Sequence, residues 1–202
     1  KKNLKLFSFI EFCFYEAQND AANYQRTYSI GEVEVEDGGI YHKTEYRERR
    51  GHYTWFGCTG TVAGFDTCRD RFVGVHNGLH DPRVVLAGKS SNSMAHGWNP
   101  IGSQQLTLDL APGEEQVFTF VLGYLEHGPE NKFIKPFVMN KEKGRALMQK
   151  YRDPKAVDAA FGDVKTRWEN LLGSFHVETP SPILNRMGNL WNQVQCMTTF
   201  NL

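Results

Sequence analysis

The sequence lacks the charge imbalance and the long apolar runs that several classes of protein need. Its 23 basic and 23 acidic side chains give a formal net charge of +0, so no overall field attracts nucleic acid or an anionic membrane. No stretch approaches the roughly 20 apolar residues of a membrane-spanning helix. The first residues, KKNLKLFSFIEFCF, lack a small-residue cleavage site after their apolar stretch. We therefore expect neither a nucleic-acid nor a membrane partner.

Cysteine is also scarce, and its four positions are isolated from one another. The absence of a C-x-x-C pair excludes zinc ribbons and thioredoxin-like chemistry. A chain with 40% hydrophobic residues can build a core without disulfides, so we expect free thiols in a reducing cytoplasm. The four residues are Cys13, Cys58, Cys68 and Cys196.

Motifs for metals and nucleophiles are equally missing. The sequence contains no G-x-S-x-G, no Gly-rich phosphate loop and no H-E-x-x-H. His76 and His80 have the spacing of two metal ligands on a helix, but Gly74, Gly78 and Pro82 disfavour a helix there. We expect no metal site at these histidines.

The first two-thirds of the chain has the pattern of a β protein. Asp37-Gly38-Gly39 predicts a hairpin turn, and the alternation in residues 104–110 predicts a strand with one solvated face. In residues 115–125, both alternating sets of side chains are largely apolar, which predicts a strand buried on both faces. Strands are predicted where β-branched and aromatic residues are enriched, in residues 4–14, 27–36, 40–46, 52–58, 104–110 and 115–125.

Between these strands, residues 59–103 are interrupted by seven glycines and two prolines. They predict a long loop region, with one helical turn near residues 66–72. Long ordered loops on a β scaffold are common places for function.

The apolar period becomes helical after about residue 140. Apolar residues from Val157 to Phe175, with Trp168 near their centre, predict one face of a helix over 155–176, started by Asp153-Pro154. We expect Trp168 to be buried. A second helical pattern over 181–202 stops without a terminator, so we expect the chain to be a segment of a longer polypeptide.

Two polar segments are candidates for ligand binding. Amide, phenol and guanidinium groups over residues 23–26 (Asn-Tyr-Gln-Arg) suit sugar hydroxyls, although the same residues also make ordinary turns. Residues 43–50 concentrate four cations and two carboxylates. Their arginines could clamp a phosphate, but a solvated or ion-paired strand end is the more common outcome.

Several longer segments of the sequence resemble the inverting β-glycoside phosphorylases, the cellobiose and chitobiose phosphorylase family (glycoside hydrolase family 94). In order along the chain these strings are FSFIEFCF, NYQRTYSIGEVEVEDGGIYHKTEYRERRGHY, AGFDTCRDRFVG, AHGWNPIGSQQLTLDLAPGE, FVLGYLE and LNRMGNLWNQVQCMTTFN. The resemblance implies a mainly β fold, a super-β-sandwich followed by a helical linker and the first helix of an (α/α)6 barrel. It assigns residues 1–140 to part of the N-terminal sandwich, 141–180 to the linker and 181–202 to the start of a truncated barrel.

The resemblance also implies the activity of the whole enzyme. Members cleave a β-linked disaccharide reversibly with inorganic phosphate and inversion, and here cellobiose is the first choice of substrate. The general acid and the phosphate ligands are expected beyond Leu202, so no residue of this chain is assigned a catalytic role. The resemblance further implies no metal or organic cofactor, a homodimer and a cytoplasmic location.

For substrate binding, the resemblance singles out the family's Asn-aromatic-Gln-Arg motif. It matches Asn23, Tyr24, Gln25 and Arg26, and it implies that Gln25 and Arg26 reach the acceptor-side sugar, with Asn23 beside them. Where many cellobiose-type members have Trp-Asn or Trp-Asp upstream, this chain has Tyr15-Glu16, which could alter acceptor preference. The alternative hypothesis is a non-catalytic carbohydrate-binding β-sandwich module.

Overall fold

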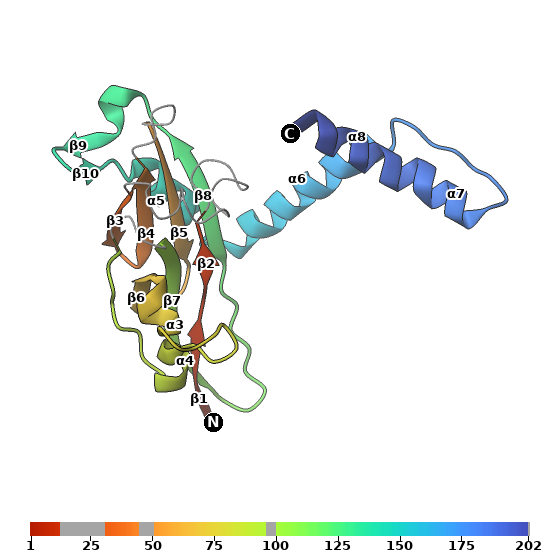
Figure 1. Ribbon diagram of the computed structural model, residues 1–202. Coiled ribbons are helices and arrows are strands. Elements are labelled where there is room, and N and C mark those ends of the chain that lie inside the picture. The colour runs from red at the N-terminus through yellow and green to blue at the C-terminus, as the bar shows by residue number, and fades with distance from the viewer. Residues whose placement is uncertain (13–30, 45–50, 96–99, 202) are drawn as a thin grey trace. The chain divides into compact units, whose positions relative to one another are not determined.

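A computed structural model describes residues 1–12, 31–44, 51–95 and 100–201 (Figure 1). The chain forms two compact units, Lys1–Arg152 and Asp153–Leu202. Unit 1 holds all the described strands and three α-helices, whereas the elements described in unit 2 are helical. The described fold is therefore mainly β sheet with additional helices.

One sheet of unit 1 is organised around a long strand. β7 (Pro100–Leu110) pairs with β1 (Lys2–Phe7) and β2 (Ile10–Glu11), and also with β6 (Val62–Cys68), always antiparallel. Leu4 of β1 stands opposite Leu108, and Leu6 stands opposite Leu106. This register places the leucines of both strands on one face, because side chains alternate between the two faces of a strand.

The second sheet has the strand order β3-β4-β5-β8 and is antiparallel throughout. The predicted hairpin joins β3 to β4, and both of its central residues have positive φ, +50° at Asp37 and +75° at Gly38. Two such residues make a type I′ turn, whose twist matches that of the strands. The strands are β3 (Gly31–Glu36), β4 (Gly39–Thr44), β5 (His52–Cys58) and β8 (Phe120–Glu126).

A hydrophobic cluster joins the two sheets into a sandwich. Phe12, which follows β2, packs with Val33, Ile40 and Phe56 of the second sheet, and each of the four is at most 3% exposed. Ile10 and Phe65 add side chains from the first sheet. Burying each such side chain contributes about 1.5–3 kcal/mol, so this cluster is a substantial stabilising contact between the two layers.

The opposite face of the second sheet is covered by a helix and a short hairpin. Tyr41, Tyr53 and Trp55 form a cluster with Met139, and Leu147 and Met148 of a helix pack against it. A Cβ atom at Gly144 would lie 2.9 Å from the Tyr41 ring, so glycine lets this helix approach the sheet. The covering elements are η1 (Pro129–Asn131), β9 (Phe133–Lys135), β10 (Val138–Met139) and α5 (Glu142–Lys150).

Residues 59–103 contain more regular structure than the sequence predicts. Besides β6 they form α3 (Arg69–Val73) and α4 (Arg83–Ala87), whose apolar side chains pack with Ile101 of β7. Gly64 and Asp66 interrupt the sequence pattern by which β6 could be recognised as a strand. The strand is stabilised by its pairing with β7. The expectation of a long loop with a single helical turn is therefore wrong for β6 and α4, while the helical turn expected near residues 66–72 corresponds to α3.

The prediction for residues 115–125 is also wrong. β8 begins only at Phe120 and lies at the edge of its sheet. Leu122 is 60% exposed and Tyr124 is 43% exposed, whereas Val121 and Leu125 pack against the Tyr41–Trp55 cluster. β8 is therefore an edge strand whose second face packs into the core at Phe120 but leaves Leu122 and Tyr124 largely exposed, in place of the expected strand buried on both faces.

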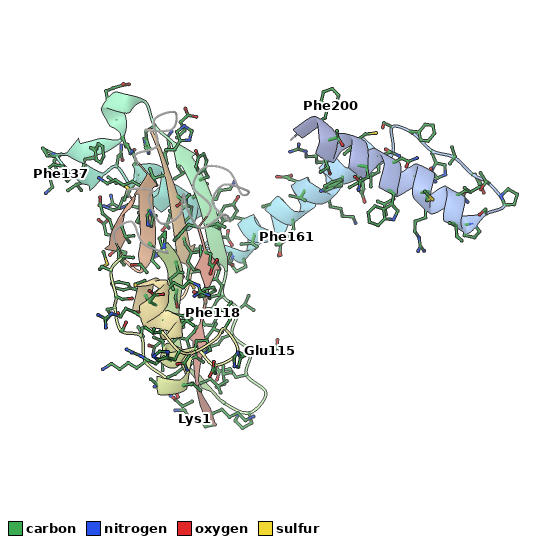
Figure 2. The ribbon with its side chains drawn as sticks, viewed as in Figure 1. Lys1, Glu115, Phe118, Phe137, Phe161 and Phe200 are labelled. Atoms are coloured by element: carbon green, nitrogen blue, oxygen red, sulfur yellow. The ribbon has the colours of Figure 1, made fainter. Side chains whose placement is uncertain are left out.

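Unit 2 begins as its sequence predicts but does not bury its apolar face. Asp153 caps its first helix by accepting from the Lys155 amide at 3.0 Å, and Pro154 occupies the first turn. No residue of this helix is buried, and Trp168 is 36% exposed, so the expectation of a buried indole is wrong. Phe161 and Phe200 are still more exposed, at 71% and 94% (Figure 2). The helices are α6 (Pro154–Leu172), α7 (Pro182–Arg186), η2 (Met187–Trp191) and α8 (Asn192–Asn201).

None of the helices described in either unit is both long and apolar enough to cross a membrane.

Candidate functional site

The segment that carries the predicted sugar-binding residues connects the two sheets of the sandwich. Asn23, Gln25 and Arg26 lie outside the described residues, as do Tyr15 and Glu16. The flanking residues are well anchored, because Phe12 and Val33 belong to the same buried cluster between the sheets. The motif is therefore carried by a connection whose two ends enter the sandwich core.

The charged segment over residues 43–50 is described only at its start. Lys43 in β4 is 3% exposed, and its Nζ lies 4.8 Å from the centroid of the Phe133 ring. Lys132 is 2% exposed and lies 5.4 Å from the same centroid. A cation over an aromatic face is stabilised by the ring quadrupole. Lys43 is thus buried and not solvated, while Arg47, Arg49 and Arg50 lie outside the described residues, so the expectation of a solvated or ion-paired strand end stays a prediction for the segment.

A buried aromatic pair, Tyr53 and His127, lies at the end of the second sheet where Lys43 pairs with Tyr53 across β4 and β5. The His127 and Tyr53 rings stack at 5.3 Å, with Nε2 of the histidine 3.4 Å from the tyrosine hydroxyl. Burial, reinforced by Lys143, lowers the pKa of His127, and burial raises the pKa of Tyr53. Both side chains are consequently neutral near pH 7, which suits their place in a packed interior.

An ion network fastens α5 to β3. The Nζ atom of Lys141 lies 2.5 Å from a Glu34 carboxylate oxygen and 3.4 Å from one of Glu36. Arg145 pairs with Glu36 as well, and the amide of Met139 donates to Glu34 at 2.8 Å. The Lys141 side chain is only 4% exposed, so its charge depends on these carboxylates for compensation.

A buried carboxylate in β6 fixes the loop that follows α4. Asp66 is 0% exposed and accepts from the amides of Ser91 and Ser93 at 3.0 and 3.1 Å, and from both hydroxyls. Thr67 donates to the Ser93 carbonyl at 2.9 Å and accepts from the Ala95 amide at 2.8 Å. The sequence did not predict this anchor. The signals that could have indicated it are the aspartate of β6 and the nearby serines at positions 90, 91 and 93.

The two spaced histidines do not share a helix face. His76 and His80 lie in an exposed connection between α3 and α4, and this stretch turns where the Asp81 carboxylate accepts from the Gly78 amide at 2.8 Å. Within the described part of the chain, no group of three or more His, Cys, Asp and Glu residues could hold a metal ion. Cys58, Cys68 and Cys196 are free thiols.

Comparison with known proteins gives matches that extend over almost the whole chain. The family described as glycosyl hydrolase 94, supersandwich domain, matches residues 1–154. The N,N'-diacetylchitobiose phosphorylase of Vibrio proteolyticus is 30% identical over 98% of this chain and 23% of its own length. The enzyme of the same name from Vibrio furnissii is 29% identical, again over 98% and 23%. A solabiose phosphorylase of Paenibacillus borealis is 23% identical over 98% of this chain and 24% of its own.

The matched relatives are much longer than this chain. The chain spans about a quarter of the length of the curated relatives it matches. The family match ends at residue 154, close to the boundary between the two units. The resemblance of the sequence to the β-glycoside phosphorylases is thus confirmed, and the chain belongs to the glycosyl hydrolase 94 family through its supersandwich domain.

Proposed function

We propose that this chain is a segment of an inverting phosphorylase that cleaves a β-linked disaccharide with inorganic phosphate. The supporting observation is that the alignment with phosphorylases covers 98% of the chain, including its helical part. A non-catalytic sugar-binding module would need only the sandwich, so this alternative is not favoured. The products are a sugar 1-phosphate and a free sugar.

The proposed reaction needs one carboxylic acid. A phosphate oxygen attacks the anomeric carbon from the face opposite the leaving sugar, and the bond from that carbon to the glycosidic oxygen breaks. The acid transfers its proton to the departing oxygen, as in inverting hydrolysis with phosphate in place of water. We assign the acid and the phosphate ligands to the part of the enzyme that this chain does not include. The mechanism requires no metal or organic cofactor.

For the domain arrangement, we propose that residues 1–140 are part of the N-terminal sandwich and 141–180 a helical linker. Residues 181–202 are then the first helix of an (α/α)6 barrel. α5 and α6 fall within the proposed linker, and the half-exposed apolar residues of α7 and η2 suit a helix that packs in a larger assembly. A homodimer and a cytoplasmic location complete the proposal.

Gln25 and Arg26, with Asn23, are proposed to bind the acceptor-side sugar. A competing structural role for Arg26 is pairing with Glu32 or Glu34 of β3. Glu34 already accepts from Lys141 and from the Met139 amide, which weakens that competing role. Cellobiose remains the first choice of substrate, while the two Vibrio relatives carry the name of N,N'-diacetylchitobiose phosphorylase.

The test is an assay of the full-length enzyme that contains this chain. We expect it to release sugar 1-phosphate from cellobiose or N,N'-diacetylchitobiose only when inorganic phosphate is present. The 202-residue chain alone should release none. Phosphorolysis by the chain alone, or hydrolysis without phosphate by the full enzyme, would contradict the proposal.

The acceptor-side role has its own test in the synthetic direction. Arg26→Ala should weaken acceptor binding by about 1.5–3 kcal/mol, the usual size of a hydrogen bond to a charged group, and raise the acceptor KM. Gln25→Ala should act in the same direction but less, since its amide is neutral. The phosphate KM in phosphorolysis serves as the control and should change little. Lower thermal stability with an unchanged acceptor KM would remove both residues from the site.

A further inference from the structure

The connection between α3 and α4 contains the one Asn-Gly pair of the sequence, Asn77–Gly78 (Figure 1). The neighbouring His76 and His80 are exposed, and both residues of the pair are partly exposed. Nothing in the phosphorylase proposal uses this stretch. The pair is therefore accessible to water and has no role assigned by the proposed reaction.

An Asn-Gly pair can modify itself chemically. The backbone nitrogen of the glycine attacks the side-chain carbonyl carbon of the asparagine, a C–N bond forms, and ammonia leaves with the proton of that nitrogen. Water then opens the resulting succinimide at either carbonyl group, which gives aspartate or isoaspartate. Glycine favours this attack, because it has no side chain to hinder the approach and its backbone is conformationally free. The dipeptide by itself thus predicts deamidation at Asn77.

Asp81 binds both of the reacting groups. Oδ1 of its carboxylate accepts from the Gly78 amide at 2.8 Å. Nδ2 of Asn77 donates to the Asp81 carbonyl at 3.0 Å and lies 3.4 Å from the other carboxylate oxygen. The Asp81 amide in turn donates to the Gly78 carbonyl at 3.2 Å. The attacking nitrogen and the attacked side chain are therefore held by a single residue.

The bond between Gly78 and Asp81 opposes deamidation in two ways. The nitrogen attacks only after it loses its proton, and a carboxylate is too weak a base to remove the proton of a peptide amide. The negative charge of the carboxylate also disfavours a nitrogen that is becoming negative, because like charges repel. Attack on Asn77 thus requires that Asp81 first releases the Gly78 amide.

We propose that Asn77 is a site of spontaneous deamidation and that Asp81 suppresses this reaction in the folded protein. The product carries an added negative charge, and isoaspartate also inserts an extra carbon atom into the backbone of the turn. The inference does not rest on the proposed phosphorylase activity. Its failure is recognised from the mass of a peptide, whereas failure of the phosphorylase proposal is recognised from catalysis.

The test is incubation of the full-length protein that contains this chain at about pH 8, both folded and in urea. Peptide mapping by mass spectrometry follows the conversion of Asn77, and labelling by an isoaspartyl methyltransferase identifies isoaspartate. We expect folded Asp81→Ala to convert about threefold to tenfold faster than the folded wild type, as the loss of a hydrogen bond to a charged group predicts. In urea both proteins should convert at the same rate, because the contact with Asp81 is absent there.

Two further variants and a matched control sharpen the test. Asp81→Asn keeps an oxygen that can accept from Gly78 but loses the charge, so its folded rate should lie between those of the wild type and Asp81→Ala. This milder change carries the comparison if circular dichroism shows that Asp81→Ala is unfolded. Gly78→Ala should slow conversion in urea, because its methyl group hinders the attack. Asp158→Ala, an exposed aspartate of α6, should convert at the wild-type rate.

Several outcomes would overturn the proposal. Equal folded rates in the wild type and the Asp81 variants would show that Asp81 gives no protection, and slower conversion in those variants would show that it assists the attack. A rate difference that persists in urea would assign the effect to the local sequence. A product without isoaspartate would exclude the succinimide route.

Discussion

Units 1 and 2 both have periodic apolar patterns in their sequences, of strand type in unit 1 and helical in unit 2, but they bury their apolar side chains very differently. In unit 1, Trp55 and Ile40 are 0% exposed and belong to clusters on opposite faces of one sheet. In unit 2, no residue from 153 to 200 is buried, and Trp168 and Trp191 are 36% and 54% exposed. A periodic pattern identifies the apolar face of an element, but burial requires a second surface that covers it.

The largest expected effect is on the free energy of unfolding, when a buried tryptophan of unit 1 and an exposed tryptophan of unit 2 are each replaced. Trp55→Ala should lower the free energy of unfolding by about 3–5 kcal/mol, because it removes a fully buried aromatic ring. Trp191→Ala should cost about 1 kcal/mol or less, since half of its surface is already exposed. Urea unfolding followed by circular dichroism measures both. Equal losses would show that unit 2 is packed as tightly as unit 1.

The next comparison concerns lysines in ion pairs. Lys141→Met should cost about 1.5–3 kcal/mol, because Glu34 and Glu36 lose the cation to which they bind. Lys165→Met in unit 2 is the control, since its pair with Glu169 is exposed and spans 3.7 Å. This change should cost at most about 0.5 kcal/mol. A stable Lys141→Met protein would mean that the network does not hold α5 in place.

A smaller effect is expected from pH. The folded state lowers the pKa of His127, whereas the unfolded chain takes up the proton near pH 6.5. The unfolded state therefore binds more protons between the two pKa values. The free energy of unfolding should fall as the pH drops below about 6.5 and level off below the folded pKa.

His127→Asn should reduce this dependence when urea unfolding is compared at pH 7.5 and 5.0. His176→Asn, an exposed position in unit 2, provides the matched control and should preserve the wild-type dependence. An unchanged slope in His127→Asn would assign the dependence to other groups.

The smallest expected effect is at the end of unit 2. Phe200→Ser should change the free energy of unfolding by no more than about 0.5 kcal/mol, because the ring is 94% exposed. Thermal unfolding of the 202-residue chain measures the change. A destabilisation comparable with that of Trp55→Ala would mean that Phe200 is packed against the protein in solution.

Local signals predicted several elements correctly. Asp37-Gly38 specified its turn through two residues that tolerate positive φ, and Asp153-Pro154 specified the start of α6. β6 was missed because its strand is stabilised by pairing with β7, across a sequence separation that no local window contains. The site motif over residues 23–26 was found by resemblance to a family, and its role stays a prediction.

By itself, the sequence determined the strand-rich first part, the helical second part and the hairpin between β3 and β4. The sequence segments shared with the β-glycoside phosphorylases also determined the family. Only the tertiary structure decided which apolar surfaces are covered and which polar residues meet. Lys43 belongs to a highly charged segment in the sequence but is buried with its Nζ over Phe133, and Asp66 lies in a predicted loop region but belongs to β6 and accepts hydrogen bonds from Ser91 and Ser93. The physical reason is that turns and caps depend on neighbouring residues, whereas burial and charge compensation depend on partners brought together by the fold.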